Sequence, residues 1–378
     1  MLKKIVFMGT SFFSVPILKS LYQNGYPISV VYTQPPKKSK RGMGVNPTPI
    51  QSLSETLNLE IRTPLSLKNN KEEYEYLKNL NADIAIVVAY GQIIPKEILS
   101  LTKKNFINIH ASLLPKWRGA APIQRSIMNL DKQTGISIMK LEEKLDTGPI
   151  CNSYSLNILE NENSESLSER LSLLAAEKII DDIDAILEDK AVFKPQDDTK
   201  ASYAIKISKS EARIDWSDSA KNIIGKINGL YPNSYFIYNG ERYKLLKVEL
   251  SAKTGEAGSV LSDNLEIACK DGSIKVLEIQ KEGKRQQKIN EFVNEVEIIT
   301  YEFENIPYKT LNKINKLKPV LPKPSVNRII QHRLAEKDFI NKLNIRTTRY
   351  VSIEKKSDID ALEDFLPGIL KTTTLGYD

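Results

Sequence analysis

The sequence predicts an α/β fold built around a mostly parallel sheet, followed by a smaller domain rich in β-strands. At 378 residues the chain is too long for one average domain. Its first 150 residues alternate short apolar runs with amphipathic stretches, which is typical of a parallel sheet covered by helices. After residue 205 the pattern changes to short alternating runs separated by glycine turns, which indicates antiparallel hairpins.

The apolar runs of the first part consist of residues that suit strands buried on both faces. We expect strands at Ile5–Met8, Ile28–Tyr32, Ile84–Ala89, Phe106–Ile109 and Ile136–Met139. The intervening stretches have apolar residues at helical spacing. We expect helices at Val15–Gln23, Pro49–Leu57 and Lys71–Leu80. Ligands of such sheets bind beyond the carboxyl ends of the strands, so the residues that follow these strands are candidates for a binding site.

The later elements divide the rest of the chain. Ser164–Leu187 is predicted to be a long helix that closes a first domain over residues 1–190. The polar stretch that begins near Lys194 indicates a linker over residues 191–208. One helix at Ser217–Leu230 and several hairpins then predict a small β-barrel over residues 209–292.

Bulk composition narrows the class of protein. The chain has a formal net charge of +7 and only two cysteines, Cys151 and Cys269, so neither a disulfide framework nor a structural zinc site is indicated. No apolar run approaches the roughly 20 residues that a membrane-spanning helix needs. We therefore expect a cytoplasmic, globular protein without a bound metal and without membrane contact.

Positive charge is concentrated near the N-terminus, where residues 1–50 contain no Asp or Glu. Lys37, Lys38, Lys40 and Arg41 lie in one loop that is flanked by prolines and glycines. One interpretation is an ordinary solvated loop. The other is a flexible basic arm that binds phosphates, because clustered cations attract a polyanion.

Asn108 and His110 form the strongest chemical signal in a chain with only two histidines. Residues i and i+2 of an extended segment point to the same side, so the amide and the imidazole face one substrate together. A lone histidine is usually structural, and Asp146, which precedes a Thr-Gly pair, is by itself an ordinary turn residue. Together, the three side chains provide an oxyanion donor, a base and a carboxylate that orients the base.

Residues 1 to 292 strongly resemble the methionyl-tRNA formyltransferase family. The matching segments are Met8-Gly9-Thr10, Tyr32–Pro35, Val88–Gly91, Asn108–Gln124, Asp146-Thr147-Gly148, Tyr203-Ala204, Lys206-Ile207 and Ala212–Trp216. The resemblance implies a Rossmann-like catalytic domain and an OB-like C-terminal barrel that binds tRNA. It also implies transfer of a formyl group from 10-formyltetrahydrofolate to the α-amine of methionyl initiator tRNA, by a monomer.

The same resemblance implies roles for individual residues. His110 takes up the proton of the attacking amine, Asn108 stabilises the tetrahedral oxyanion, and Asp146 orients His110. The folate carries the activated one-carbon unit, so no nucleophilic side chain is needed. The folate contacts are assigned to Ser112, Leu113, Leu114, Pro115, Val88, Tyr90 and Gly91. Contacts to the acceptor stem are assigned to the basic loop, which favours its phosphate-binding interpretation.

The tail, residues 296–378, resembles an internal piece of the carboxyaminoimidazole ribonucleotide synthase family, an ATP-grasp enzyme. The matching segments are Thr300–Pro307, His332–Lys337, Leu370–Thr372 and Leu375–Asp378. The metal-binding carboxylates of that family are missing, so we expect a truncated, non-catalytic fragment. Its expected elements are a strand at Val296–Thr300, helices at Tyr308–Leu317 and Ile329–Leu343, and a strand at Ile369–Lys371.

Two alternatives remain open at this point. Other folate-dependent formyltransferases and hydrolases share the Asn, His and Asp set, and they act on a sugar nucleotide, glycinamide ribonucleotide or water. The second alternative is a non-catalytic RNA-binding fusion product whose tail blocks the site. The basic loop, the segment that follows Pro115 and the basic barrel favour a tRNA acceptor.

Overall fold

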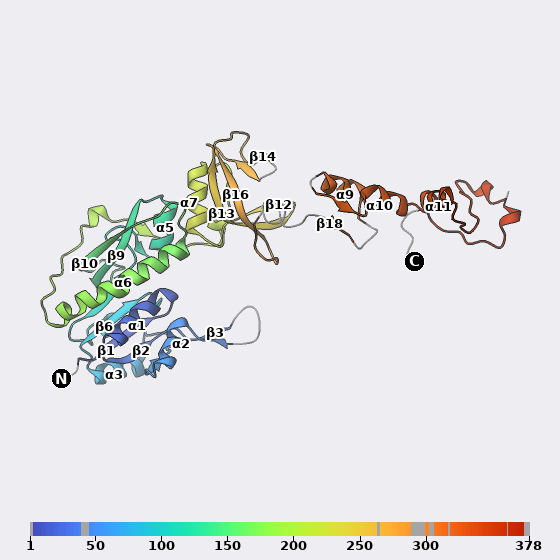
Figure 1. The fold of residues 1–378 in the computed structure, drawn as a ribbon. Coiled ribbons are helices and arrows are strands. Elements are labelled where there is room, and N and C mark those ends of the chain that lie inside the picture. The colour runs from blue at the N-terminus through green and yellow to red at the C-terminus, as the bar shows by residue number, and fades with distance from the viewer. Residues whose placement is uncertain are drawn as a thin grey trace. The chain divides into compact units, whose positions relative to one another are not determined.

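The computed structural model describes residues 3–38, 45–262, 265–288, 299–301, 306–316, 318–360 and 362–373. The chain forms two compact units, residues 1–286 and 287–378. The first unit contains an α/β domain and a second, β-rich domain (Figure 1). Among the described residues, no helix is long and apolar enough to cross a membrane.

The α/β domain is built on a seven-stranded sheet in the order β10-β9-β7-β6-β1-β2-β5. Its strands are β1 (Ile5–Gly9), β2 (Ile28–Tyr32), β5 (Ile61–Arg62), β6 (Ile84–Val88), β7 (Phe106–His110), β9 (Gln133–Lys140) and β10 (Ile150–Asn157). The five strands from β5 to β7 run parallel, and β9 and β10 are added antiparallel. The strand order changes direction between β1 and β6, which is the point where ligands of such sheets bind.

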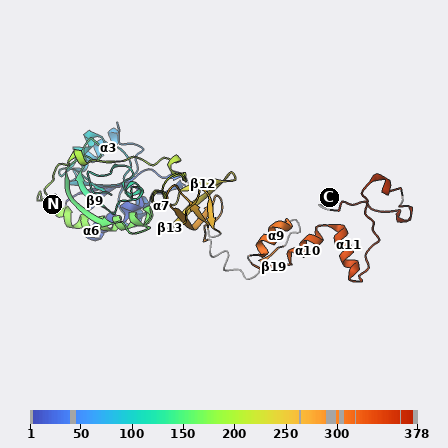
Figure 2. The same ribbon diagram turned by 90° about the horizontal axis from the view of Figure 1, so that it is seen from above.

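Helices cover both faces of this sheet. They are α1 (Val15–Gln23), α2 (Pro49–Thr56), α3 (Lys71–Leu80), α4 (Lys96–Leu99), α5 (Pro122–Met128) and α6 (Ser164–Leu187). One core cluster joins the sheet to α1, α2, α5 and α6, and a second joins it to α3 and α4. Figure 2 shows α3 and α6 on opposite sides of the domain. This two-layer covering explains why the central strands are continuously apolar in the sequence.

The predicted strands and helices of this domain are confirmed, but β5, α4 and α5 were not predicted, and two further differences matter for the site. β10 was not predicted, because an edge strand with Asn152, Ser153 and Ser155 lacks an apolar run. The segment 191–208 is not a free linker. Its strand β11 (Tyr203–Ala204) pairs with β8 (Arg118–Gly119), and Lys194 forms a bridge with Ile150.

The second domain consists of α7 (Ala220–Gly229) packed on an antiparallel sheet in the order β12-β13-β16-β15-β14. The strands are β12 (Tyr235–Tyr238), β13 (Glu241–Ser251), β14 (Val260–Ser262), β15 (Glu266–Ala268) and β16 (Ser273–Lys281). The predicted hairpin turn at Asn239-Gly240 joins β12 to β13. The predicted helix and antiparallel strands are confirmed as a sheet domain.

The second unit contains β18 (Ile299–Thr300) parallel to β19 (Val320–Leu321), and the helices α9 (Tyr308–Asn315), α10 (Pro324–Ile330) and α11 (Arg333–Lys342). The predicted single helix at Ile329–Leu343 is wrong, because the helix breaks and His332 caps α11 by accepting a bond from the backbone of Ala335. The predicted strand at Ile369–Lys371 is also wrong. Ile369 and Leu370 are largely exposed and pair with no strand among the described residues.

Candidate active site

Asn108 and His110 lie at the carboxyl end of β7, between β6 and β9. Both side chains are buried to more than nine-tenths, at 9% and 6% exposure. The His110 ring is held by two neighbours, whereas the Asn108 side chain makes no hydrogen bond with the part of the chain that the structure describes. The Asn108 amide is not one of the fully buried polar atoms without a partner, so it is reached by solvent and is available to bond a substrate.

The two nitrogens of His110 face different partners. Nε2 lies 2.9 Å from the backbone oxygen of Trp117. A carbonyl oxygen only accepts hydrogen bonds, so Nε2 carries a hydrogen and donates it. Nδ1 lies 3.6 Å from Oδ2 of Asp146. Nδ1 is therefore the ring nitrogen without a hydrogen in the neutral imidazole, and it is the one that faces the carboxylate.

Asp146 lies in the turn between β9 and β10, in the left-handed conformation at φ +51°. Its Oδ2 also accepts a hydrogen bond of 2.8 Å from the backbone N–H of Gly119. The next glycine, Gly148, is required by sterics, because a Cβ there would lie 1.9 Å from the backbone oxygen of Lys140. The turn thus brings a carboxylate from a separate loop onto the histidine predicted from sequence.

The predicted folate-binding segment, Ser112–Pro115, follows β7 directly. Ser137 of β9 fixes it, since its hydroxyl donates to the oxygen of Ser112 at 2.8 Å and accepts from the N–H of Leu114 at 3.0 Å. The Ser112 hydroxyl donates to the oxygen of Lys116 at 2.6 Å. These hydrogen bonds hold the segment in place beside His110. The side chains of Leu113 and Pro115 are partly exposed.

The second predicted folate-binding segment follows β6. The side chains of Val88 and Tyr90 are buried in the two cores, and burial raises the pKa of the Tyr90 hydroxyl. A ligand at this strand end would therefore meet the backbone of Val88 and Tyr90, whose side chains are at most 2% exposed. Gly91 adopts φ +76°, and its oxygen accepts a bond of 2.9 Å from Nε2 of Gln34.

The basic loop is joined to this segment. Lys37 and Lys38 form β3, which pairs with β4 (Val45–Asn46). Nζ of Lys37 donates to Oε1 of Gln34 at 3.1 Å, and Gln34 in turn bonds the oxygens of Tyr90 and Gly91. Lys37, one of the predicted tRNA contacts, is therefore linked through Gln34 to the backbone that follows β6. The other two, Lys40 and Arg41, lie outside the described residues.

Three residues that the sequence analysis did not assign support the site. Arg118 is buried, at 2% exposure, and bonds Oε1 of Gln196. Gln196 bonds the backbone of Asp146 and Gly148. Asp131 accepts from the Trp117 indole N–H at 2.8 Å. An arginine directly before the small-residue run Gly119–Pro122 was the available signal for a buried charge.

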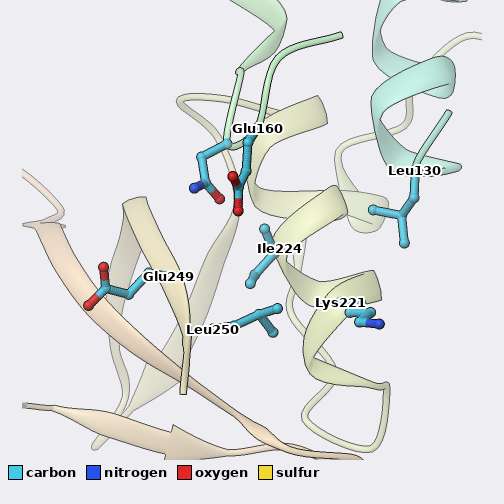
Figure 3. Close-up of a pocket in the computed structure, with 7 residues that line it drawn as sticks. Leu130, Glu160, Lys221, Ile224, Glu249 and Leu250 are labelled. Carbon is cyan, nitrogen blue, oxygen red and sulfur yellow. The ribbon is translucent and has the colours of Figure 1, made fainter. Parts of the chain in front are cut away.

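A separate pocket lies between the two domains of the first unit, with a volume of about 410 Å³. Figure 3 shows Ile224 of α7 next to Leu250 of β13, with Lys221 and Glu249 on opposite sides of this pair. None of the predicted site residues lines it. Among the described residues, no group of three or more His, Cys, Asp or Glu side chains is arranged to hold a metal ion.

The chain matches known formyltransferases over both domains. The family model described as formyl transferase matches residues 3–183, and that described as the formyl transferase C-terminal domain matches residues 206–297. A methionyl-tRNA formyltransferase from Pelagibacter ubique is 64% identical over 302 residues, which cover 79% of this chain and 97% of that protein. The enzyme of the same name from Jannaschia sp. is 44% identical, covering 74% of this chain and 93% of that protein.

Solved structures share the fold at lower identity. The N-formyltransferase from Helicobacter canadensis, in complex with folinic acid and dTDP-3-aminofucose, has a TM-score of 0.57 at 18% identity and covers 74% of this chain and 100% of that chain. HypX from Aquifex aeolicus, in complex with tetrahydrofolic acid, has a TM-score of 0.55 at 14% identity and covers 84% of this chain and 57% of that chain.

Proposed function

Because the chain belongs to the methionyl-tRNA formyltransferase family, and so catalyses formyl transfer to methionyl-tRNA, we propose the following substrates and site. The formyl donor is 10-formyltetrahydrofolate, and the acceptor is the α-amine of methionyl initiator tRNA, for translation initiation. The catalytic residues are Asn108, His110 and Asp146. The protein acts as a cytoplasmic monomer, and its second domain, an OB-like barrel, contacts the tRNA.

The observation that carries this proposal is the presence of three different groups at the carboxyl end of β7. A free amide, an imidazole with a fixed tautomer and a carboxylate come from β7 and from the turn after β9. This combination suits attack of an amine on a carbonyl carbon, which needs an oxyanion donor and a proton acceptor. It offers no nucleophilic side chain for a covalent intermediate.

The residues present fit a formylated folate. The Asn108 amide faces the same side of β7 as His110. The segment Ser112–Pro115 is held by hydrogen bonds with Ser137 and does not depend on a ligand for its position. The backbone of Val88, Tyr90 and Gly91 lies at the neighbouring strand end. When bound, the folate supplies a formyl group on an activated nitrogen.

The protein groups then divide the work of the reaction. The Asn108 side-chain N–H stabilises the oxygen that becomes negative when the amine attacks. The Trp117 carbonyl keeps the Nε2 hydrogen of His110 in place, so the proton released by the amine is taken up at Nδ1, beside the Asp146 carboxylate. From there it can pass to the nitrogen that leaves when its bond to the formyl carbon breaks. The sequence analysis expects Asp146 to orient His110, and the carboxylate faces Nδ1, the nitrogen proposed to take up the proton.

The test is formyl transfer from 10-formyltetrahydrofolate to methionyl initiator tRNA by the full chain. Asn108→Ala removes the oxyanion donor and is expected to lower kcat by about 10²–10³-fold. Asn108→Asp keeps the size but removes the donor, so it should reduce kcat as much. Transfer only to another acceptor, or hydrolysis without transfer, would contradict the proposal.

For the tail we propose that residues 299–373 take no part in formyl transfer. Both family matches end by residue 297, and the tail belongs to a separate compact unit. Its likeness to an ATP-grasp fragment stays a prediction, and Leu375–Asp378 lie outside the described residues. A chain ending at residue 292 is expected to keep the kcat of the full chain. A large loss or gain in that assay would assign the tail an active or inhibitory role.

A further inference from the structure

Gln196 lies in the segment between the two family matches, which end at residue 183 and resume at residue 206. Its Nε2 nevertheless donates to two backbone oxygens of the catalytic turn, that of Asp146 at 2.9 Å and that of Gly148 at 2.8 Å. One side-chain amide therefore holds both ends of the tripeptide that carries the catalytic carboxylate.

This turn needs an external restraint. Asp146 has φ +51°, a left-handed conformation that is strained for a residue with a Cβ. Such a conformation persists only where the surroundings over-determine it. Backbone hydrogen bonds from Gln196 on one side, and the bond from the Gly119 N–H to Oδ2 on the other, provide that restraint.

The orientation of the Gln196 amide is itself fixed. Arg118 donates to its Oε1 from Nε at 3.1 Å and from Nη2 at 2.8 Å. Because a guanidinium only donates, the oxygen must face Arg118 and the NH₂ must face the catalytic turn. Arg118 is almost fully buried, and its Nη2 forms an ion pair with Oδ1 of Asp198 at 2.7 Å. Asp198 belongs to the same segment, 191–208, as Gln196.

We propose that Gln196, oriented by Arg118, is a positioning residue that sets the Asp146 carboxylate against Nδ1 of His110. The segment 191–208 thereby completes the catalytic site rather than only connecting two domains. This inference rests on the proposed roles of His110 and Asp146 in formyl transfer.

The first test replaces Gln196 by Glu, which keeps the length and the acceptor for Arg118 but cannot donate to two carbonyl oxygens. Misplacing a catalytic group by about 1 Å costs about 10²-fold, so we expect kcat to fall about 10- to 100-fold. The KM for methionyl-tRNA should stay within about twofold, since Gln196 holds the turn and not the tRNA. The matched control is Asp197→Asn, because the hydrogen bonds and ion pair of Asp197 go to its neighbours Thr199 and Lys200.

The second test does not use activity. The chain has only two histidines, His110 and His332, and His332 belongs to the other compact unit. In ¹⁵N-histidine NMR spectra of the full chain, Gln196→Glu should shift the ring signals of His110 and leave those of His332 unchanged. His332→Asn assigns the two sets. Arg118→Lys, which keeps the charge but removes the two-pronged hydrogen bond, should shift the His110 signals in the same direction and provides a second variant if Gln196→Glu does not fold.

Two results would overturn the inference. One is unchanged His110 signals with unchanged kcat in both variants. The other concerns the single-turnover rate of formyl transfer, measured with excess enzyme. If Gln196 acts through Asp146, Gln196→Glu should lower this rate in the wild-type chain but not in the Asp146→Asn variant. An equal fold-reduction of the rate in both backgrounds would therefore overturn the inference. Failure of the proposed function is distinguished from both, because it appears as a wild-type chain that does not formylate methionyl-tRNA.

Discussion

Nδ1 of His110 lies 3.6 Å from Oδ2 of Asp146, while Nε2 of the same ring bonds the backbone oxygen of Trp117. The carbonyl fixes which nitrogen carries the hydrogen, and the carboxylate faces the one that does not. A histidine and an aspartate placed against each other in this way act as one unit in the proposed reaction.

Substitutions in this pair are therefore expected to be non-additive. His110→Gln and Asp146→Asn should each lower kcat by about 10²–10⁴-fold, and the double variant should be no worse than the poorer single variant. Formyl transfer at saturating tRNA measures this. His332→Gln is the matched control, because His332 lies in the other compact unit and should leave kcat unchanged. If the fold-reductions in kcat of the two single variants multiply in the double variant, His110 and Asp146 have independent roles.

The basic loop should contribute electrostatic affinity for tRNA. Replacing Lys37, Lys38, Lys40 and Arg41 by Gln is expected to weaken tRNA binding and to reduce the slope of log K against log salt by about 0.9 for each phosphate that is no longer neutralised. Folate binding should be unaffected. Lys71 and Lys78 are exposed cations of α3 and serve as the control pair. A weakening of tRNA binding that does not change with salt would argue against phosphate contacts.

Gly148 should tolerate no side chain. A Cβ at this position would lie 1.9 Å from the backbone oxygen of Lys140, so Gly148→Ala must displace the turn that carries Asp146. We expect stability to fall by about 3 kcal/mol, together with a large decrease in kcat. Gly25→Ala is the control, because Gly25 has a positive φ but nothing within 4 Å of its added Cβ, and about 1 kcal/mol is expected there. Equal effects on kcat would refute this account.

Glu211 links the two domains of the first unit through its ion pair with Arg125 at 2.7 Å. The hydrogen bond from Arg125 lowers the pKa of the Glu211 carboxyl from 4.5 to about 2. The folded-state pKa is depressed, so this stabilisation is present above pH 4.5 and is lost as the pH falls toward 2.

Glu211→Gln should therefore reduce the free energy of unfolding by about 1–2 kcal/mol at pH 7, and the difference from wild type should narrow below about pH 4.5. Denaturant unfolding at several pH values measures this. The control is Glu143→Gln, whose ion pair with Lys96 is more than 70% exposed on both sides and should change stability by less than about 0.5 kcal/mol. A pH-independent difference would mean that the charge of Glu211 is not what stabilises the contact.

Apolar periodicity was enough to predict the central strands and most helices of the catalytic domain, because strands buried on both faces must be continuously apolar. Apolar periodicity gave wrong or missing predictions for segments whose secondary structure does not depend on the burial of apolar side chains. The edge strand β10 is polar, and the apolar triplet Ile369–Lys371 has no strand partner among the described residues. A single break at His332 divided a helix that spacing alone had joined.

The sequence by itself determined the chemistry of this protein. Asn108 and His110 share one side of a strand because the period of a strand is two residues, and that holds whatever the rest of the chain does. Only the tertiary structure decided which atoms meet. The contacts of His110 with Trp117 and Asp146, and of Asp146 with Gln196, join segments that are separated in the chain, and they follow from strand order and loop closure rather than from any local pattern.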